Sequence, residues 1–183
     1  EEGKIDLDAP LQDYLDTPLP EIDFNRSWRG YQDLKGDKRY EKITARMCLS
    51  HTTGFPNWRF LTKTGFDIDG HLHFQSAPGT RYSYSGEGFS LLQFVVEKIE
   101  DKGLEEIAQE RIFEPLAMDR TSYIYTLQNV FENQYAFGHD KDQNLIPFDQ
   151  ADEAGAAGSL CTTLTDYSKF IEAVLEKQLL KKV

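Results

Sequence analysis

The sequence is poor in cysteine and in basic residues. Its 183 residues include two cysteines, Cys48 and Cys161, and no Cys-x-x-Cys pair, so neither a disulfide framework nor a cysteine-rich zinc site is indicated. We expect both thiols to be unpaired and buried, with one disulfide between them as the alternative. The 20 lysines and arginines are outnumbered by 31 aspartates and glutamates, which gives a net charge of -11. This sign disfavours nucleic acid and anionic membrane surfaces as partners.

The sequence also lacks a long hydrophobic run. The longest nearly uncharged apolar stretch, Phe89 to Val96, is far shorter than the roughly 20 residues that span a bilayer. The first residues, Glu1 to Lys4, have neither the basic start nor the apolar stretch of a signal peptide. The last residues, Leu179 to Val183, fall inside a helical pattern without a stop signal. We therefore expect the chain to be a section of a longer protein.

Hydrophobic residues make up 39% of the chain and aromatic residues 13%, which is enough to build a hydrophobic core without disulfides or a structural metal. The length favours one domain, or part of one, and we expect a single unit over residues 1–183. The patterns predict a mainly α-helical fold with a few short strands. One short strand is expected at Leu72 to Phe74, where residues alternate in character ahead of the Pro78-Gly79 turn.

Five helices are predicted, and the first is a short one that Asp8-Ala9-Pro10 begins and that runs to Leu15. Thr44 can cap a short helix over 45–50, and Gly86 and Gly88 open the most regular helix of the chain. Further helices are expected from Leu104 to just before Pro115, and after the capping pattern Thr163-x-x-Asp166. In the helix that Gly86 opens, helical spacing predicts an apolar stripe of Phe89, Leu92, Val96 and Ile99, which Val95 widens. Residues 119–153 show no sustained periodicity, so strands or irregular structure are expected there.

Two histidine-containing groups invite a functional interpretation. Asp67, Asp69, His71 and His73 alternate along the chain, and on one strand face they could bind Zn²⁺. Against this, Asp69-Gly70 is typical of a turn, which would break the shared face. Ser50 and His51 are adjacent and do not face each other on a helix, so we expect His51 to brace the helix end rather than to activate Ser50.

Tyr82-Ser83-Tyr84-Ser85-Gly86 lies between the Pro78-Gly79 turn and the most regular helix. A side chain at such a place can point into a cleft from a rigid support. Tyrosine can act as a general base when neighbouring cations favour its phenolate. Packing and capping are the commoner roles of such residues, so chemistry alone leaves both interpretations open.

Five segments of the chain carry recognisable motifs. They are Gly3 to Pro10, Ile43 to Gly54 with Leu49-Ser50-His51-Thr52-Thr53-Gly54, Pro78 to Gly86, Ile112 to Met118, and Ala157 to Asp166. In this order they resemble the serine β-lactamase-like family, which includes class C β-lactamases, D-alanyl-D-alanine peptidases and related esterases. The resemblance covers most of the chain and implies the helical region of the β-lactamase/transpeptidase-like fold, in incomplete form.

The family's nucleophile is the serine of a Ser-x-x-Lys motif, and no Ser-x-x-Lys occurs in the 183 residues. The family's Tyr-x-Asn motif aligns on Tyr84-Ser85-Gly86, which implies that Tyr84 is the catalytic tyrosine. Gly86 replaces an asparagine whose amide would contact substrate, so β-lactamase activity is in doubt, and Glu87 is expected to face the gap. Trp58, in a loop that borders the family's cleft, is implied as a substrate contact, with aromatic packing as the alternative.

The resemblance implies a serine hydrolase that acts through an acyl-enzyme on a small-molecule amide or ester substrate, without cofactor or metal. We expect no turnover from the 183 residues alone. A non-catalytic binding module on the same scaffold and a metal-binding module using His71 and His73 remain alternatives. Members of the family are mostly exported, which implies a periplasmic or otherwise exported protein, and self-association of the chain is possible through surface that a missing lobe would cover.

Overall fold

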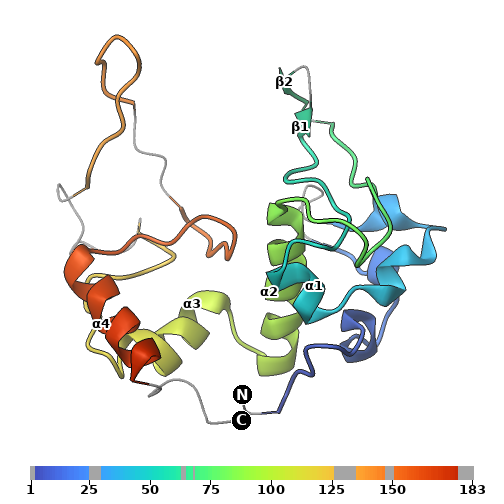
Figure 1. Cartoon of the computed structure of the whole chain (residues 1–183), viewed down its shortest axis with the longest axis horizontal. Coiled ribbons are helices and arrows are strands. Elements are labelled where there is room, and N and C mark those ends of the chain that lie inside the picture. Colours follow the sequence, from blue (N-terminus) through green and yellow to red (C-terminus); the bar gives the residue numbers. More distant parts are fainter. Residues whose placement is uncertain are drawn as a thin grey trace. The chain divides into compact units, whose positions relative to one another are not determined.

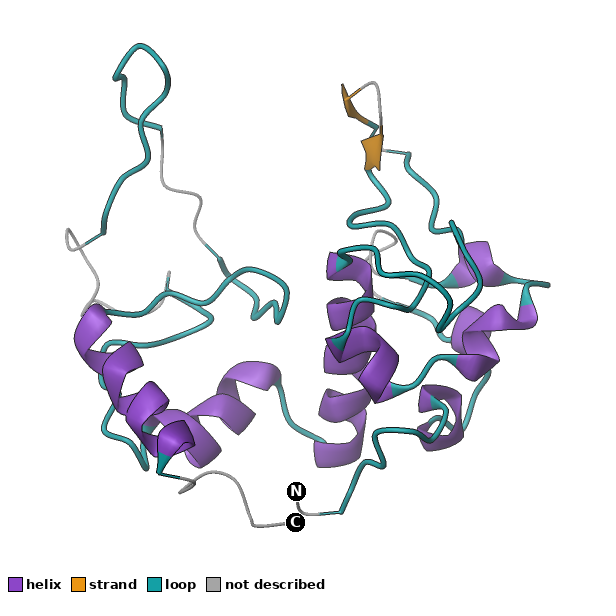
Figure 2. Cartoon of the chain, in the orientation of Figure 1, coloured by secondary structure: helices purple, strands orange, loops and turns teal. Residues whose placement is uncertain are grey.

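The computed structural model describes residues 3–24, 30–62, 65–67, 69–125, 135–146 and 151–176. The chain divides into two compact units, Glu1–Asp101 and Lys102–Val183. Figure 2 shows helices joined by long loops, with one small sheet in the described part. The prediction of a mainly α-helical fold with few strands is confirmed. That the whole chain forms one domain stays a prediction.

The first unit is built around α1 (Ala45–Leu49) and α2 (Gly86–Glu100), which pack against each other (Figure 1). As predicted, the Thr44 hydroxyl caps α1 by accepting the Met47 N–H at 3.3 Å. Ser85 caps α2 in the same way, accepting the Gly88 N–H at 3.0 Å. Short 3₁₀ helices complete the unit: η1 (Leu11–Tyr14), η2 (Leu19–Glu21), η4 (Gln32–Leu34) and η5 (Lys38–Lys42).

The most buried line of α2 differs from the predicted stripe. Leu91 and Val95 are fully buried in the core of the first unit, whereas Phe89, Leu92, Val96 and Ile99 are only partly buried. Two of those, Leu92 and Ile99, pack against the same core from beside that line. The prediction is confirmed for Val95 but wrong about the centre of the buried side, because α2 carries apolar residues on more than one face and spacing alone does not locate that centre.

The sheet of the first unit has two strands, β1 (Leu61–Thr62) and β2 (Gly65–Phe66), paired antiparallel with Leu61 opposite Phe66. The predicted strand at Leu72 to Phe74 was wrong. Leu72 and Phe74 are buried in the core, but the Leu72 N–H donates to the Asp33 carboxylate at 2.8 Å. A side chain therefore satisfies the backbone where a strand would need a neighbouring strand.

The second unit contains α3 (Leu104–Ala108), which continues into the π-helical turn η6 (Gln109–Phe113), and α4 (Leu164–Leu175). Both helices were predicted. The Thr163 hydroxyl caps α4 by accepting the Asp166 N–H at 3.2 Å. Between them, the described parts of 119–153 contain no helix, as expected, and residues 126–134 and 147–150 of that segment lie outside the description.

The two cysteines are both free thiols. Cys48 is fully buried in the core of the first unit, and burial raises the pKa of its thiol to about 12. Cys161, in the second unit, is only half-buried, which corrects the expectation for that residue. Among the helices in the described ranges, none combines the length and the apolar character needed to cross a bilayer.

Candidate active site

Tyr84 lies in the segment that leads from the Pro78-Gly79 turn to the start of α2. The residue is 57% exposed, so Tyr84 is accessible at the surface of the first unit. The turn itself is fastened to the end of α1, since the Gly79 N–H donates to the Thr52 carbonyl at 2.8 Å. The segment therefore presents an accessible phenol from an anchored backbone, while a catalytic role for Tyr84 stays a prediction.

His51 anchors the backbone on both sides of Tyr84. Its carbonyl accepts the Ser83 N–H at 2.8 Å, and its Nδ1 accepts the Ser85 N–H at 3.1 Å. The imidazole also packs on the Tyr84 ring, with 4.5 Å between centroids. Ser50 does not take part, because its hydroxyl donates to the Arg46 carbonyl at 2.8 Å. The adjacent Ser50 and His51 thus have separate structural roles.

The loop after α1 is tied to the first residues of α2. The Asn57 carbonyl accepts the N–H groups of Gly86 and Glu87 at 2.9 and 3.0 Å, and the Asn57 side-chain oxygen accepts Gly86 again at 3.0 Å. The Ser85 hydroxyl donates to the Pro56 carbonyl at 2.8 Å. These bonds satisfy amides that a helix start leaves without partners and fix the loop beside residue 86.

A buried ion pair reinforces this junction. The Glu87 carboxylate accepts from the Arg59 Nε and Nη2 at 3.0 and 2.8 Å and from the Arg59 backbone N–H at 2.8 Å. A further nitrogen of Arg59 donates to the Gly30 carbonyl at 2.5 Å. Burial opposes the charge of Arg59, but its bonds to Glu87 raise the pKa of the guanidinium. Glu87 thus points into the protein and not into the gap at residue 86, which corrects our expectation.

Trp58 lies directly against Gly86. A Cβ atom at residue 86 would be 2.6 Å from the Trp58 Cζ2, much closer than the roughly 3.5 Å at which carbon atoms pack. The indole in turn stacks on Phe60, with centroids 5.6 Å apart, and Phe60 contacts Phe66 of β2. The structure therefore brings Trp58 to Gly86, two residues after Tyr84, so the three predicted site residues gather at the start of α2.

The alternating Asp and His residues do not share a strand face. The Asp69 N–H donates to the Asp67 carboxylate at 3.1 Å, in the turn that the Asp69-Gly70 pair predicts. His71 pairs instead with Asp33, its Nδ1 lying 2.8 Å from the carboxylate, and this partner raises the pKa of His71. His73 bonds to the His71 carbonyl. In the described segments, no three side chains of His, Cys, Asp or Glu are grouped as metal ligands.

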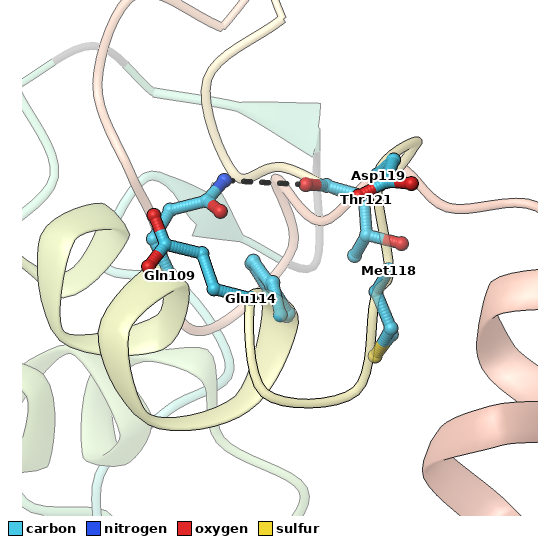
Figure 3. Close-up of a pocket in the computed structure, with 6 residues that line it drawn as sticks. Gln109, Glu114, Met118, Asp119 and Thr121 are labelled. Atoms are coloured by element: carbon cyan, nitrogen blue, oxygen red, sulfur yellow. Dashed lines mark hydrogen bonds between the residues drawn. The ribbon is translucent and has the colours of Figure 1, made fainter.

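The second unit has a small open pocket of about 220 Å³ beside η6. Figure 3 shows Gln109 and Thr121 linked across it by a hydrogen bond to the Thr121 carbonyl. Neither Tyr84, Gly86 nor Trp58 lines this pocket. Its lining residues are Gln109, Phe113, Glu114, Met118, Asp119 and Thr121.

Sequence reasoning proposed Tyr84, Gly86 and Trp58 as site residues, which stays a prediction, and it missed the residues that hold them in place. The partners of these residues come from positions far apart in the chain: His51 lies 34 residues before Ser85, and Arg59 lies 28 residues before Glu87. No local pattern links such pairs. The left-handed backbone of His51, with φ of 55°, is uncommon for a residue other than glycine and was also not visible in the sequence.

Comparison with known proteins places this arrangement in a family. An unguisins hydrolase of Aspergillus campestris is 27% identical over 153 residues, covering 74% of this chain and 28% of the fungal protein. The D-amino acid amidase of Ochrobactrum anthropi SV3, solved with D-phenylalanine, superposes with a TM-score of 0.69 at 20% identity, over 99% of this chain and 56% of the amidase. The octameric penicillin-binding protein homologue of Pyrococcus abyssi gives a TM-score of 0.64 at 23% identity, over 97% and 41% of the two chains.

The chain thus spans between about a quarter and just over half of these proteins. Further matches include a D-aminopeptidase of Brucella anthropi, a D-alanine carboxypeptidase of Burkholderia cenocepacia and a class C β-lactamase. The fold is accordingly part of the β-lactamase/transpeptidase fold, as the sequence motifs predict. The model of the Beta-lactamase family matches residues 1–183, and the chain belongs to that family.

Proposed function

We propose that this chain is the largely helical section of a serine hydrolase that acts on amide or ester substrates through an acyl-enzyme. One observation supports this most: an exposed Tyr84 phenol on a backbone that His51 fixes on both sides. The nucleophilic serine and its lysine belong to the rest of the hydrolase, since the 183 residues contain no Ser-x-x-Lys. The partial coverage of the related proteins agrees with this.

In the proposed mechanism, Tyr84 moves one proton in two steps. As the serine oxygen attacks the carbonyl carbon of the substrate, the Tyr84 phenolate takes the hydroxyl proton. When the tetrahedral intermediate collapses, the phenol returns that proton to the leaving amine or alkoxide, and the acyl group stays on the serine. The motif lysine of the complete site favours the phenolate by its positive charge. Such a base must be held within hydrogen-bond reach of the nucleophile.

Gly86 and Trp58 form the substrate-contact part of the proposal. Where the family motif has an asparagine, this chain has a glycine, and the Trp58 indole, which stacks on Phe60, lies where the side chain of residue 86 would begin. The face of an aromatic ring offers apolar contact and carries no hydrogen-bond donor. This favours esters or amides with an apolar group beside the scissile bond over β-lactams, whose recognition by the family uses the missing amide.

Covalent labelling tests the proposal. The intact hydrolase should react with a fluorophosphonate or penicillin probe at a serine outside the 183 residues, and mass spectrometry of the labelled peptide identifies that serine. The 183-residue chain alone should show no hydrolysis of nitrocefin or a p-nitrophenyl ester above buffer. An intact protein that no probe labels would instead be the non-catalytic binding module, for which Gly86 is the motivating residue.

Other parts of the proposal have their own tests. We propose an exported protein, which fractionation of cells would show. We also propose that the 183-residue chain self-associates, since α4 exposes Leu164 and Leu175, and sedimentation would detect this. The metal-binding alternative gains no support from the pairing of His71 with Asp33. Stoichiometric zinc in the purified protein would revive it.

A further inference from the structure

We propose that His51 is a positioning residue for Tyr84, acting through the hydrogen bond that its imidazole accepts from the following peptide. This inference rests on the proposed function of Tyr84. His51 does not itself reach the reacting atoms in the proposal. It determines where the backbone of Tyr84 lies, and thereby where the phenol can reach.

The two bonds of His51 bracket a single residue. Ser83 donates its N–H to the His51 carbonyl at 2.8 Å, and Ser85 donates its N–H to the His51 Nδ1 at 3.1 Å. Tyr84 is the one residue between these two donors. Its backbone is therefore attached before and after to the same anchor, and a loss of either bond frees one side of it.

The imidazole also supports the Tyr84 ring. The two ring centroids are 4.5 Å apart with the planes tilted by 36°. Around the same imidazole, Phe89 of α2 lies at 5.2 Å and Tyr82 meets it edge-on at 5.9 Å. Because the Tyr84 side chain is more than half exposed, this contact is important for keeping the phenol in one orientation.

The hydrogen bond from the Ser85 N–H to Nδ1 determines the tautomer of the His51 imidazole. Nδ1 can accept the Ser85 N–H only when it carries no proton, so the ring proton of the neutral imidazole is on Nε2. The bond from the Ser85 N–H therefore requires an acceptor atom at the Nδ1 position. The contact with the Tyr84 ring requires only an aromatic ring at residue 51. The two needs can be separated by substitution.

Two substitutions make this separation. Asparagine has its Oδ1 bonded to Cγ, as Nδ1 is in histidine, and it tolerates the left-handed backbone that His51 adopts, with φ of 55°. His51→Asn therefore keeps the acceptor and loses the ring. His51→Phe keeps an aromatic ring against Tyr84 and loses the acceptor.

Kinetics of the intact hydrolase test the role. We expect His51→Phe to lower kcat by about 100-fold with little change in KM, because a misplaced base weakens the chemical step more than binding. His51→Asn should restore most of that loss. In a Tyr84→Phe background, His51→Phe should have no further effect on kcat. A wild-type kcat in His51→Phe, or an equal loss with and without Tyr84, would overturn the proposal.

Nuclear magnetic resonance of the 183-residue chain separates this inference from the proposed function. With ¹⁵N labelling, a coupling across the hydrogen bond should connect the Ser85 amide nitrogen to the His51 Nδ1, and the imidazole shifts should report a proton on Nε2. Absence of that coupling, or a proton on Nδ1, overturns the positioning role whatever the hydrolase does. A protein that shows the coupling but takes no fluorophosphonate label would instead contradict the proposed function.

Discussion

The indole of Trp58 occupies the space that any side chain at residue 86 would need. Because a Cβ there would lie 2.6 Å from the Trp58 Cζ2, the glycine is a packing requirement of this chain. The replacement of the motif asparagine by Gly86 is thus coupled to Trp58, which lies in the loop after α1. Gly86 and Trp58 form a matched pair, and changing one should have consequences that changing the other relieves.

Gly86→Ala should lower the free energy of unfolding by about 1–3 kcal/mol, because the added methyl forces Trp58 or the start of α2 to move. In the double variant Trp58→Ala, Gly86→Ala, the methyl has room, so its cost relative to Trp58→Ala should be close to zero. Urea unfolding followed by circular dichroism measures both values. Gly158→Ala is the matched control, because a Cβ at that position meets nothing within 4 Å. Equal costs with and without Trp58 would contradict the pairing.

Glu87→Ala should destabilise the chain by roughly 3 kcal/mol, since it leaves the buried Arg59 guanidinium without its carboxylate. The comparison is Asp8→Asn, which removes the partner of Arg46 in an exposed ion pair. We expect that change to leave the urea midpoint almost unaltered. A Glu87 variant as stable as the Asp8 variant would show that the Arg59 pair does not hold the loop to α2.

The sequence predicted the helices of this chain better than its contacts. The Thr44 and Thr163 caps are local signals, readable within four residues, and both are confirmed. The strand at Leu72 was mispredicted because alternation indicates which side chains are buried and not what the backbone bonds to. Here the carboxylate of Asp33, far away in sequence, accepts the Leu72 N–H that a neighbouring strand would otherwise accept. Tyr84 could be proposed from its motif, but the hydrogen bonds of His51 to Ser83 and Ser85 could not. In the sequence, His51 stands beside Ser50, and only that adjacent pair was considered.

The two cysteines should differ in reactivity. Cys48 is fully buried and burial raises the pKa of its thiol to about 12, so it should resist iodoacetamide in the folded chain at pH 8. Cys161 is half-buried and should react first, although burial raises its pKa as well. Counting labels by mass spectrometry before and after unfolding checks this, with Cys161→Ser as the control. Rapid labelling of Cys48 in the folded chain would contradict the buried position.

Asp166 should make the second unit sensitive to acid. Burial opposes its ionisation, but hydrogen bonds from the Arg120 N–H at 2.8 Å, from Lys169 and from Thr121 hold the pKa of its carboxyl below the ordinary value. A carboxyl with a lowered folded pKa stabilises the protein above its unfolded pKa of about 3.9, and that contribution is lost as pH falls through the folded pKa.

Asp166→Asn should therefore cost roughly 2 kcal/mol at pH 7, where the charged hydrogen bonds are present, and progressively less below about pH 4. Urea titrations from pH 7 to pH 3 give the difference at each pH. A cost for Asp166→Asn that stays constant down to pH 3 would argue against an ionised Asp166 in the folded chain.

The most direct test of the proposed function is the acylation rate of the intact hydrolase with Tyr84→Phe. The substitution removes one oxygen from an exposed residue, so the fold and the binding of a p-nitrophenyl ester should be preserved. If Tyr84 transfers the serine proton, single-turnover acylation should slow by about 10²–10⁴-fold. Acylation of the Phe variant at the wild-type rate would show that the proton takes another route, and the role proposed for this chain would be wrong.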